Sequence, residues 1–315
     1  MKNKFAMYMR TISLISFVVI AFGFSLNPNA VKLEYVFKVG DEYVMSQSTK
    51  QSLKQIIMGT EQKGENEYTG DLKMKVTEVT GDGAKIEMQF IKLKSKSVTV
   101  MGEILMDSEG NAEEVQNKML KAMMNKSFTV TANKFGQIVN VEGAENLWAD
   151  LSSMNLDDRA TATAKQTLAQ FMDNSALRSN IEQAMVRYSE NKVKEGDKWN
   201  SRTELPMDFP IKVDNSWSLI SVSGGTAKVN ADGIFTTTDK EKTIDLPNGI
   251  KAKVDLNGAQ QVKSTVNVKT GWATDMLIHS ELKGKMILLA GGMLPENMDV
   301  PMEIVTDTSY KITKK

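Results

Sequence analysis

The sequence predicts an α+β fold that is mainly β, with two related antiparallel β-units (each half-barrel-like) joined by a central helical block. Three observations predict it. Apolar residues alternate with charged residues toward both ends of the chain, as in antiparallel strands with one wetted face. Apolar spacings of three and four residues dominate the middle, as in amphipathic helices. A Gly-Asp turn followed by an aromatic residue occurs in both halves, at residues 40–43 and 196–199, which indicates an internal repeat.

The first β-unit, residues 31–143, contains the clearest local signal. Residues 72–76 and 84–90 each alternate between apolar and charged side chains, and Gly81-Asp82-Gly83 lies between the two runs. Two runs of period two around an Asp-Gly turn predict a β-hairpin. A short helix is expected near residues 112–125, because a valine and two methionines repeat there at four-residue spacing.

The helical segment, residues 144–191, separates the two β-units. Its leucine, isoleucine, methionine and aromatic residues recur three and four residues apart, which predicts amphipathic helices. The second β-unit, residues 192–315, returns to strands and has glycine turn signals such as Asp232-Gly233 and Asn257-Gly258. The expected order is therefore sheet, helices, sheet.

Residues 1–25 are predicted to be a secretory signal peptide. Basic residues precede an uncharged, mostly apolar run from Thr11 to Leu26, which is shorter than the roughly 20 residues of a spanning helix. Cleavage is expected after Ser25 or after Ala30, and a retained N-terminal anchor is the alternative. We expect an exported protein, periplasmic or associated with the outer envelope, with no transmembrane segment in the mature chain. The absence of cysteine excludes a lipoprotein anchor.

Composition excludes several function classes. The chain has 39 basic and 39 acidic residues, so it lacks the basic excess that nucleic-acid binding normally requires. It has no cysteine and one histidine, which removes disulfides, thiolate metal sites and any site that needs two histidines. No metal site, cofactor or nucleic-acid partner is expected.

The residues that could support catalysis have simpler structural roles. The single histidine, His279, falls on the charged face of a predicted strand together with Glu281. The acidic pairs Glu113-Glu114 and Asp157-Asp158 fall at the starts of predicted helices, where negative charge is favourable. We therefore expect no catalytic residues and no enzyme activity.

The methionine content suggests a ligand. Flexible, polarizable methionine side chains line adaptable apolar sites, although they also fill irregular cores. The first hypothesis is a binding protein for an apolar small molecule such as a lipid, held between curved sheet and helices. The alternatives are a structural or interaction module that contacts another envelope protein, and an enzyme that acts on polysaccharide or peptide through carboxylates. The candidate ligand-binding residues are Met74, Ile86, Met88, Phe90, Phe171 and Met185.

Several short motifs resemble an uncharacterised family of exported Bacteroidota envelope proteins. They are Gly40-Asp41-Glu42-Tyr43, Gln55-Ile56 with Gly59, Val76-Thr77-Glu78-Val79, the run from Gly136 to Gly143, and Gly196-Asp197-Lys198-Trp199. The resemblance implies an envelope protein without an assigned activity and supplies no catalytic residues. Members often begin with a lipidated cysteine, which this chain lacks.

Overall fold

The computed structural model of the protein describes residues 30–100, 102–111, 114–153, 174–205, 210–246, 250–291 and 294–315. The predicted signal peptide at residues 1–25 lies outside the described residues.

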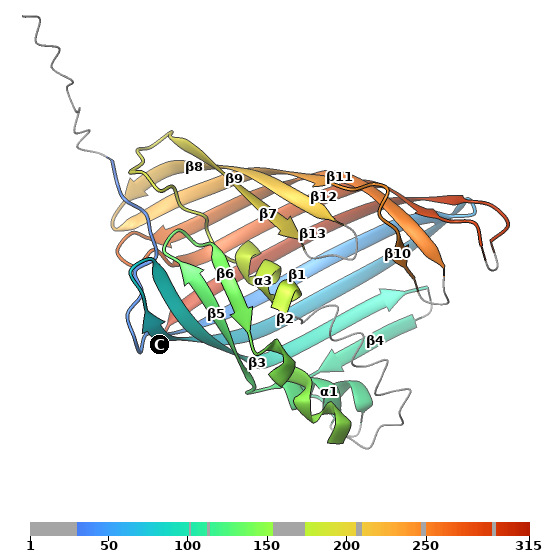
Figure 1. Cartoon of the computed structure of the whole chain (residues 1–315), viewed down its shortest axis with the longest axis horizontal. Coiled ribbons are helices and arrows are strands. Elements are labelled where there is room, and N and C mark those ends of the chain that lie inside the picture. Colours follow the sequence, from blue (N-terminus) through green and yellow to red (C-terminus); the bar gives the residue numbers. More distant parts are fainter. Residues whose placement is uncertain are drawn as a thin grey trace, which may run out of the picture.

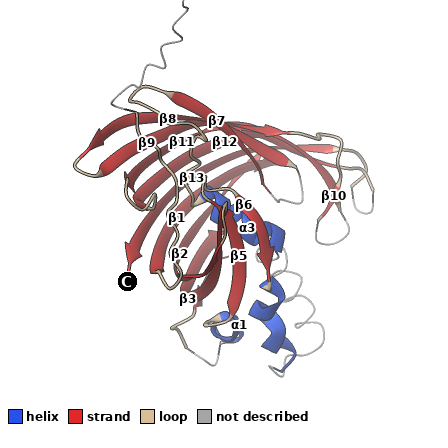
Figure 2. Cartoon of the chain, turned by 60° about the vertical axis from the view of Figure 1, so that its left-hand side comes forward, coloured by secondary structure: helices blue, strands red, loops and turns tan. Residues whose placement is uncertain are grey.

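The described chain forms one strongly curved antiparallel sheet of 13 strands (Figures 1 and 2). Its strand order is β6-β5-β3-β2-β1-β13-β12-β11-β9-β8-β7, and two short strands lie off this path, with β4 paired to β3 and β10 paired to β11. The strands are β1 (Glu42–Ile57), β2 (Thr60–Val79), β3 (Gly83–Thr99), β4 (Gly102–Asp107), β5 (Ser127–Asn133), β6 (Ile138–Glu142), β7 (Lys198–Leu205), β8 (Ile211–Ser223), β9 (Thr226–Thr237), β10 (Ile244–Asp245), β11 (Lys251–Asn267), β12 (Ala273–Leu288) and β13 (Met298–Lys314).

The predicted fold class is wrong. The sequence predicts an α+β fold in which a central helical block joins two β-units, whereas a single sheet contains the strands of both halves. The reason is a long-range pairing between the first and the last strand, from Tyr43 opposite Lys314 to Gln55 opposite Met302. The local periodicity of the sequence does not predict which distant strands pair.

The central segment contributes little helix to the described structure. The 3-10 helix η1 (Ala144–Ser153) and the α-helix α3 (Asn174–Gln183) are its described helices. The apolar stripe that predicts a longer helix continues past the end of α3 to Met185 and Tyr188, which are buried in a non-helical stretch. Residues 154–173 lie outside the described residues.

The β2–β3 hairpin confirms the period-two prediction. Met74 faces Met88 and Val76 faces Ile86 across the hairpin, and all four side chains are buried. Another α-helix, α1 (Val115–Met123), lies in the segment where a short helix is expected. None of the helices in the described part of the chain combines the length and the apolar character needed to span a bilayer.

Helix α3 lies within the curve of the sheet and is bonded to both of its edge strands (Figure 2). The Ser179 hydroxyl donates to the Glu204 carbonyl of β7 at 3.1 Å. On the other side, the Glu182 carboxylate accepts a hydrogen bond from the backbone N–H of Ile138 in β6. The helix therefore bridges two edges that do not pair with each other, and this satisfies polar backbone groups that a sheet edge leaves free.

The N-terminal segment, residues 30–41, crosses one end of the sheet. Val31 forms an antiparallel bridge with Val193, the Tyr35 N–H donates to the Lys134 carbonyl, and the Val36 N–H donates to the Thr270 carbonyl. Tyr35 packs edge-on against Trp272 at 5.1 Å between ring centroids. These contacts tie together the turns of β5–β6 and β11–β12 at this end of the sheet.

The two Gly-Asp turns share one local geometry. Gly40 and Gly196 both have a φ of +88°, and the N–H of the following aspartate donates to a carbonyl three residues back at 3.0 Å in each turn. Glycine suits this positive φ because it has no Cβ. The likeness extends to the neighbouring strand, because the Gly40 N–H donates to the Val76 carbonyl of β2 and the Gly196 N–H donates to the Leu219 carbonyl of β8. The sheet that contains both turns is continuous.

Candidate functional site

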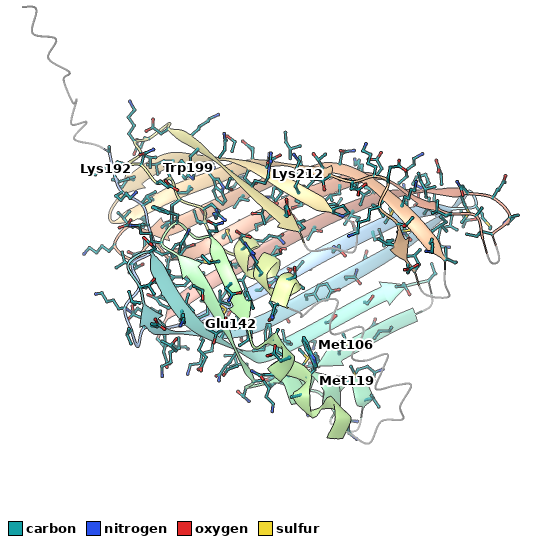
Figure 3. The ribbon with its side chains drawn as sticks, viewed as in Figure 1. Met106, Met119, Glu142, Lys192, Trp199 and Lys212 are labelled. Atoms are coloured by element: carbon teal, nitrogen blue, oxygen red, sulfur yellow. The ribbon has the colours of Figure 1, made fainter. Side chains whose placement is uncertain are left out.

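The two faces of the sheet differ in chemistry. We call inner face the side that carries Tyr43, Met45 and Met74 and on which α3 lies. The outer face carries rows of exposed ion pairs, such as Lys54–Glu61 at 2.6 Å and Lys283–Glu303 at 2.9 Å. Among the residues that Figure 3 labels, Lys212 lies on the outer face and Trp199 on the inner face.

The inner face is almost free of charge. Within the described strands, alternation brings one charged side chain to this face, Lys314 at the last residue of β13. Its ammonium group lies 2.7 Å from an Asp41 carboxylate oxygen. All other inner positions of these strands are apolar or neutral polar side chains or glycines, so the charge segregation runs across the whole sheet.

Eight neutral polar residues and one glycine form a continuous row across the inner face. The row follows the cross-strand register over β3, β2, β1, β13, β12, β11, β9, β8 and β7. Its first part is Ser97, Asn66, Gln51 and Thr306. Its second part is Ser280, Gln260, Gly233, Asn215 and Ser201. We call these nine residues the polar row.

The polar row separates two apolar clusters. On one side of it lie Ile278, Val262 and Trp217, which belong to the larger core around α3. On the other side lie Leu282 and Val213, which belong to a second cluster. Over β8, β11 and β12 the inner face is thus banded along the strand direction, with polar residues between two apolar groups. On β1, β2 and β13 the next inner positions on one side are Thr49, Tyr68 and Thr308.

The second part of the polar row is buried except at half-buried Ser201, and its amides are paired. Gln260 and Asn215 are each 7% exposed, and Gln260 Nε2 donates to Asn215 Oδ1 at 2.8 Å. Gly233 lies between them, where a Cβ atom would come within 2.3 Å of Asn215 Oδ1. The missing side chain therefore lets the two amides meet across β9.

The first part of the polar row is half-buried and hydrogen-bonded in a chain. Asn66 Nδ2 donates to Gln51 Oε1 at 3.1 Å, and Gln51 Nε2 donates to the Thr306 hydroxyl at 3.4 Å. Tyr68, on the inner face beside this part, is 43% exposed. This region is the accessible part of the inner face.

A small crevice lies between α3 and the buried part of the polar row. Its volume is about 20 Å³, enough for a single water molecule. Glu182 and Arg187 line it and pair at 2.5 Å. Burial raises the pKa of Glu182 and lowers the pKa of Arg187, and each partner's charge opposes the effect on the other. The crevice is too small for a lipid.

The candidate residues predicted from the sequence are mostly parts of the filled core. Met74, Ile86 and Met88 are buried in the larger cluster, and half-buried Phe90 packs on Phe128 with 5.8 Å between ring centroids. Met185 is buried and borders the crevice. Phe171 lies outside the described residues.

Sequence reasoning missed the polar row. Each strand does show a signal, a polar residue in the apolar phase, as in Ile278-x-Ser280-x-Leu282 and Val213-x-Asn215-x-Trp217. The signals join into one row only through the register of nine strands, which the sequence does not specify locally.

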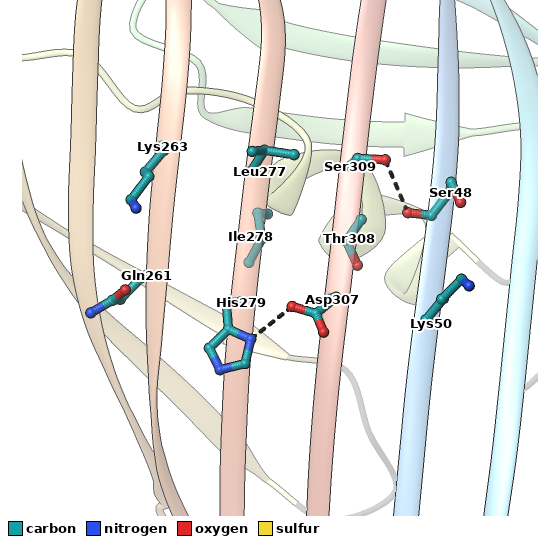
Figure 4. Close-up of a pocket in the computed structure, with 10 residues that line it drawn as sticks. All are labelled: Ser48, Lys50, Gln261, Lys263, Leu277, Ile278, His279, Asp307, Thr308 and Ser309. Atoms are coloured by element: carbon teal, nitrogen blue, oxygen red, sulfur yellow. Dashed lines mark hydrogen bonds and ion pairs between the residues drawn. The ribbon is translucent and has the colours of Figure 1, made fainter.

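A depression of about 390 Å³ lies on the outer face, across β11, β12, β13 and β1 (Figure 4). His279 lies in this depression, on the charged face where the alternation predicts it. Its Nδ1 is 2.7 Å from an Asp307 carboxylate oxygen, and its Nε2 is 3.3 Å from a Glu281 carboxylate oxygen. Hydrogen bonds to Asp307 and then Glu281 raise the pKa of His279. In the described part of the chain, no three histidine or acidic side chains are gathered so as to hold a metal ion.

Comparisons with known proteins give a family but no activity. The model of a family of unknown function (DUF6263) matches residues 81–273, more than half of the chain. No curated protein matches.

Solved structures show only distant likeness. A structure of lipovitellin, reported for its lipid-protein interactions, is similar over 89% of this chain at 7% identity, with a TM-score of 0.46. This chain covers 25% of that lipovitellin chain. An outer membrane channel from Pseudomonas putida F1 is similar over 89% of this chain and 97% of its own, at 7% identity and a TM-score of 0.29.

Proposed function

Because the chain belongs to the family of unknown function DUF6263, which assigns it no activity, we propose a role from its geometry. The protein is a non-enzymatic binding protein that holds an uncharged, largely apolar molecule such as a lipid against the accessible part of its inner face. The observation that carries this proposal is that the described strands place a single charged side chain, Lys314, on the inner face.

The uncharged inner face is unusual for a surface that water reaches. Tyr68 and Ile104, both on the inner face, are 43% and 57% exposed, so this part of the face is accessible among the described residues. Solvent-facing sheet surfaces normally carry charged side chains, as the outer face does here. A protein face that loses its water when a ligand binds is expected to carry few charged side chains, because burying an unpaired charge is very costly. The accessible inner face fits that requirement.

The proposed non-catalytic role is supported by the same chemistry. General acid–base catalysis needs titratable groups at the place where a ligand lies. Among the described strands, Lys314 is the charged side chain on the inner face, and Glu182 and Arg187, which line the crevice, are bonded to each other. Tyr68, beside the accessible part, is a neutral phenol, because burial raises its pKa above the usual value. A ligand on the accessible part would meet amides, hydroxyls and apolar groups.

The test combines extraction with a matched pair of variants. Leu53 lies half-buried on the inner face of β1, and its neighbour Ser52 is exposed on the outer face. Mass spectrometry of an organic extract of detergent-free protein is expected to find a stoichiometric apolar molecule. Leu53→Asp should lower its occupancy about tenfold or more, whereas Ser52→Asp should leave it unchanged. A clean extract from folded wild-type protein, or equal occupancy in both variants, would overturn the proposal.

Export to the cell envelope is part of the proposal and rests on the basic N-terminus and apolar run of residues 1–26. The test is N-terminal sequencing of the protein from an envelope fraction. We expect the mature chain to begin at Leu26 or Val31. A chain that retains Met1 in the cytoplasmic fraction would contradict export.

A second candidate, an interaction module without a ligand, is favoured by the edge strand β4. Ile104 and Leu105 of β4 are 57% and 46% exposed, and β3 is the strand that pairs with β4 in the described sheet. Such an apolar edge is a template for pairing with another chain. Cross-linking from a residue placed at Glu103 would capture one specific envelope protein under this alternative, and a bound ligand would be absent.

A further inference from the structure

We infer that the accessible part of the polar row binds the uncharged, hydrogen-bonding headgroup of an amphiphile, so that the ligand class is a neutral lipid with hydroxyl, ester or amide groups. This inference rests on the proposed function and narrows it to one class of lipid. The residues that carry it are Asn66, Gln51 and Thr306.

These three side chains retain hydrogen-bonding capacity toward the interior of the sheet's curve. Their mutual bonds use one N–H of Asn66, the oxygen and one N–H of Gln51, and the hydroxyl oxygen of Thr306 as acceptor. A primary amide has two N–H donors, and a hydroxyl has one. By this count one N–H on each amide, the Asn66 oxygen and the Thr306 hydroxyl proton are available to a ligand.

The buried part of the polar row is unsuited to the same task. Gln260 and Asn215 are 7% exposed and bonded to each other at 2.8 Å. The neighbouring crevice of about 20 Å³ leaves room for no more than a water molecule. A headgroup is therefore directed to the half-buried part on β1, β2 and β13.

Apolar surface lies directly beside this part of the row. The next inner positions toward the β1–β2 turn are Gly64, Leu53 and Ile304. They face one another across β2, β1 and β13. A Cβ at Gly64 would meet its nearest atom, the Val98 carbonyl oxygen, only at 3.6 Å, so the glycine leaves a shallow gap above β2. An acyl chain can lie across these residues while its headgroup meets the polar row.

The described strands place no counter-charge beside Gln51, and this sets the charge of the ligand. An ionised carboxylate or phosphate at Gln51 would lose hydration without meeting a cation, because the nearest lysine on the same strand, Lys50, points to the outer face. Neutral hydrogen-bond donors and acceptors can replace the lost hydration of a neutral headgroup far better than they can replace that of an ion. We therefore expect discrimination against the anionic form of an otherwise identical lipid.

The experiment compares a monoacylglycerol with the fatty acid of the same chain length, at about pH 8, where the acid is ionised. Binding to the full mature chain is measured by displacement of an uncharged fluorescent probe. Wild-type protein should bind the monoacylglycerol at least about tenfold more tightly than the fatty acid anion.

Substitutions in the polar row and on the outer face distinguish headgroup recognition from a general effect on the fold. Gln51→Glu places a charge in the polar row and should weaken monoacylglycerol binding about tenfold or more, whereas Gln261→Glu makes the same change on the outer face and should have no effect. Gln51→Met removes the amide and keeps the size, so it should weaken monoacylglycerol binding about threefold to tenfold while the uncharged probe still binds.

The outcomes distinguish the inference from the proposed function. Equal or tighter binding of the fatty acid anion, or unchanged binding by Gln51→Glu, overturns the inference and leaves a binding protein for apolar molecules. No binding of either lipid or of the probe by folded wild-type protein overturns the proposed function, and the inference with it.

Discussion

At the scale of single residues, the turn between β1 and β2 holds an unexpected side chain. Met58 and Gly59 form a two-residue turn in which φ is +50° and +77°, and Met58 is 80% exposed. Positive φ at both positions favours asparagine or glycine, because a larger side chain clashes with its own backbone. Met58→Asn should raise the free energy of unfolding by about 0.5–1 kcal/mol in urea titrations. Gly59→Ala, at the neighbouring position, should lower it. A methionine that proves as stable as asparagine would contradict the assigned turn.

His279 makes the stability of the protein depend on pH in one direction. Hydrogen bonds to Asp307 and Glu281 raise its pKa above the ordinary value of 6.5. A raised pKa in the folded state means that the stabilisation is complete below the unfolded pKa and is lost as pH rises through the folded pKa. His279→Gln should therefore be less stable than wild type near pH 5.5, and the difference should shrink toward pH 8.5. Because the ring is 45% exposed, the effect should stay below about 1 kcal/mol. A gap that grows with pH would refute this account.

The residues that face inward could be predicted from the sequence, but the polar row could not. Alternation alone places Met74, Ile86 and Met88 on the buried face, where the structure has them. The same alternation puts Gln51 and Gln260 in the apolar phase of their strands. Their common row depends on how nine strands are shifted against one another, and each shift is fixed by contacts far apart in the chain.

At the scale of elements, α3 connects the two edge strands and contributes Glu182 to an ion pair with Arg187. Glu182 is 8% exposed and bonds to both Arg187 and the β6 backbone. Arg187→Met should lower the free energy of unfolding by roughly 3 kcal/mol, because it leaves a buried carboxylate without its partner. The double variant with Glu182→Gln should recover most of that loss, because it removes the buried charge and keeps an acceptor for the Ile138 N–H. The measurement is urea unfolding of both variants, and a double variant no more stable than the single one would argue against the pairing.

Helix α3 also explains why the fold class was mispredicted. The stripe Leu177, Ile181, Met185 and Tyr188 has helical spacing, yet the helix ends at Gln183. Past that point, burial comes from tertiary contacts: the Val186 N–H donates to the Tyr35 hydroxyl at 3.0 Å, and the Tyr188 hydroxyl donates to the Gly271 carbonyl at 2.6 Å. Apolar spacing alone cannot separate a helical turn from a buried irregular segment held by distant partners.

At the scale of the whole molecule, the chain's first and last strands are neighbours near the middle of the sheet. β1 and β13 pair along most of their lengths, and the Thr49 and Thr308 hydroxyls lie 3.1 Å apart across them. The two halves of the chain are therefore connected by a backbone ladder as extensive as those within each half. Because each half would expose a long strand edge without this ladder, the sheet should unfold as one cooperative unit.

The cooperativity can be tested with Tyr310, a buried residue of β13 beside Gln47 of β1 and Met276 of β12. Tyr310→Ala leaves a cavity at the junction and should lower the free energy of unfolding by about 3 kcal/mol. In hydrogen-exchange mass spectrometry under mildly destabilising urea, amide protection should fall together in β2–β3 and in β9–β11, although none of these strands pairs with β13. Val139→Ala, at an exposed position of β6, serves as the control and should leave both regions protected. Loss of protection in β9–β11 alone would mean that the two halves of the chain unfold independently, as the two-unit interpretation of the sequence requires. Loss in both would mean that the β1–β13 ladder makes one folding unit from a chain whose local patterns suggest two.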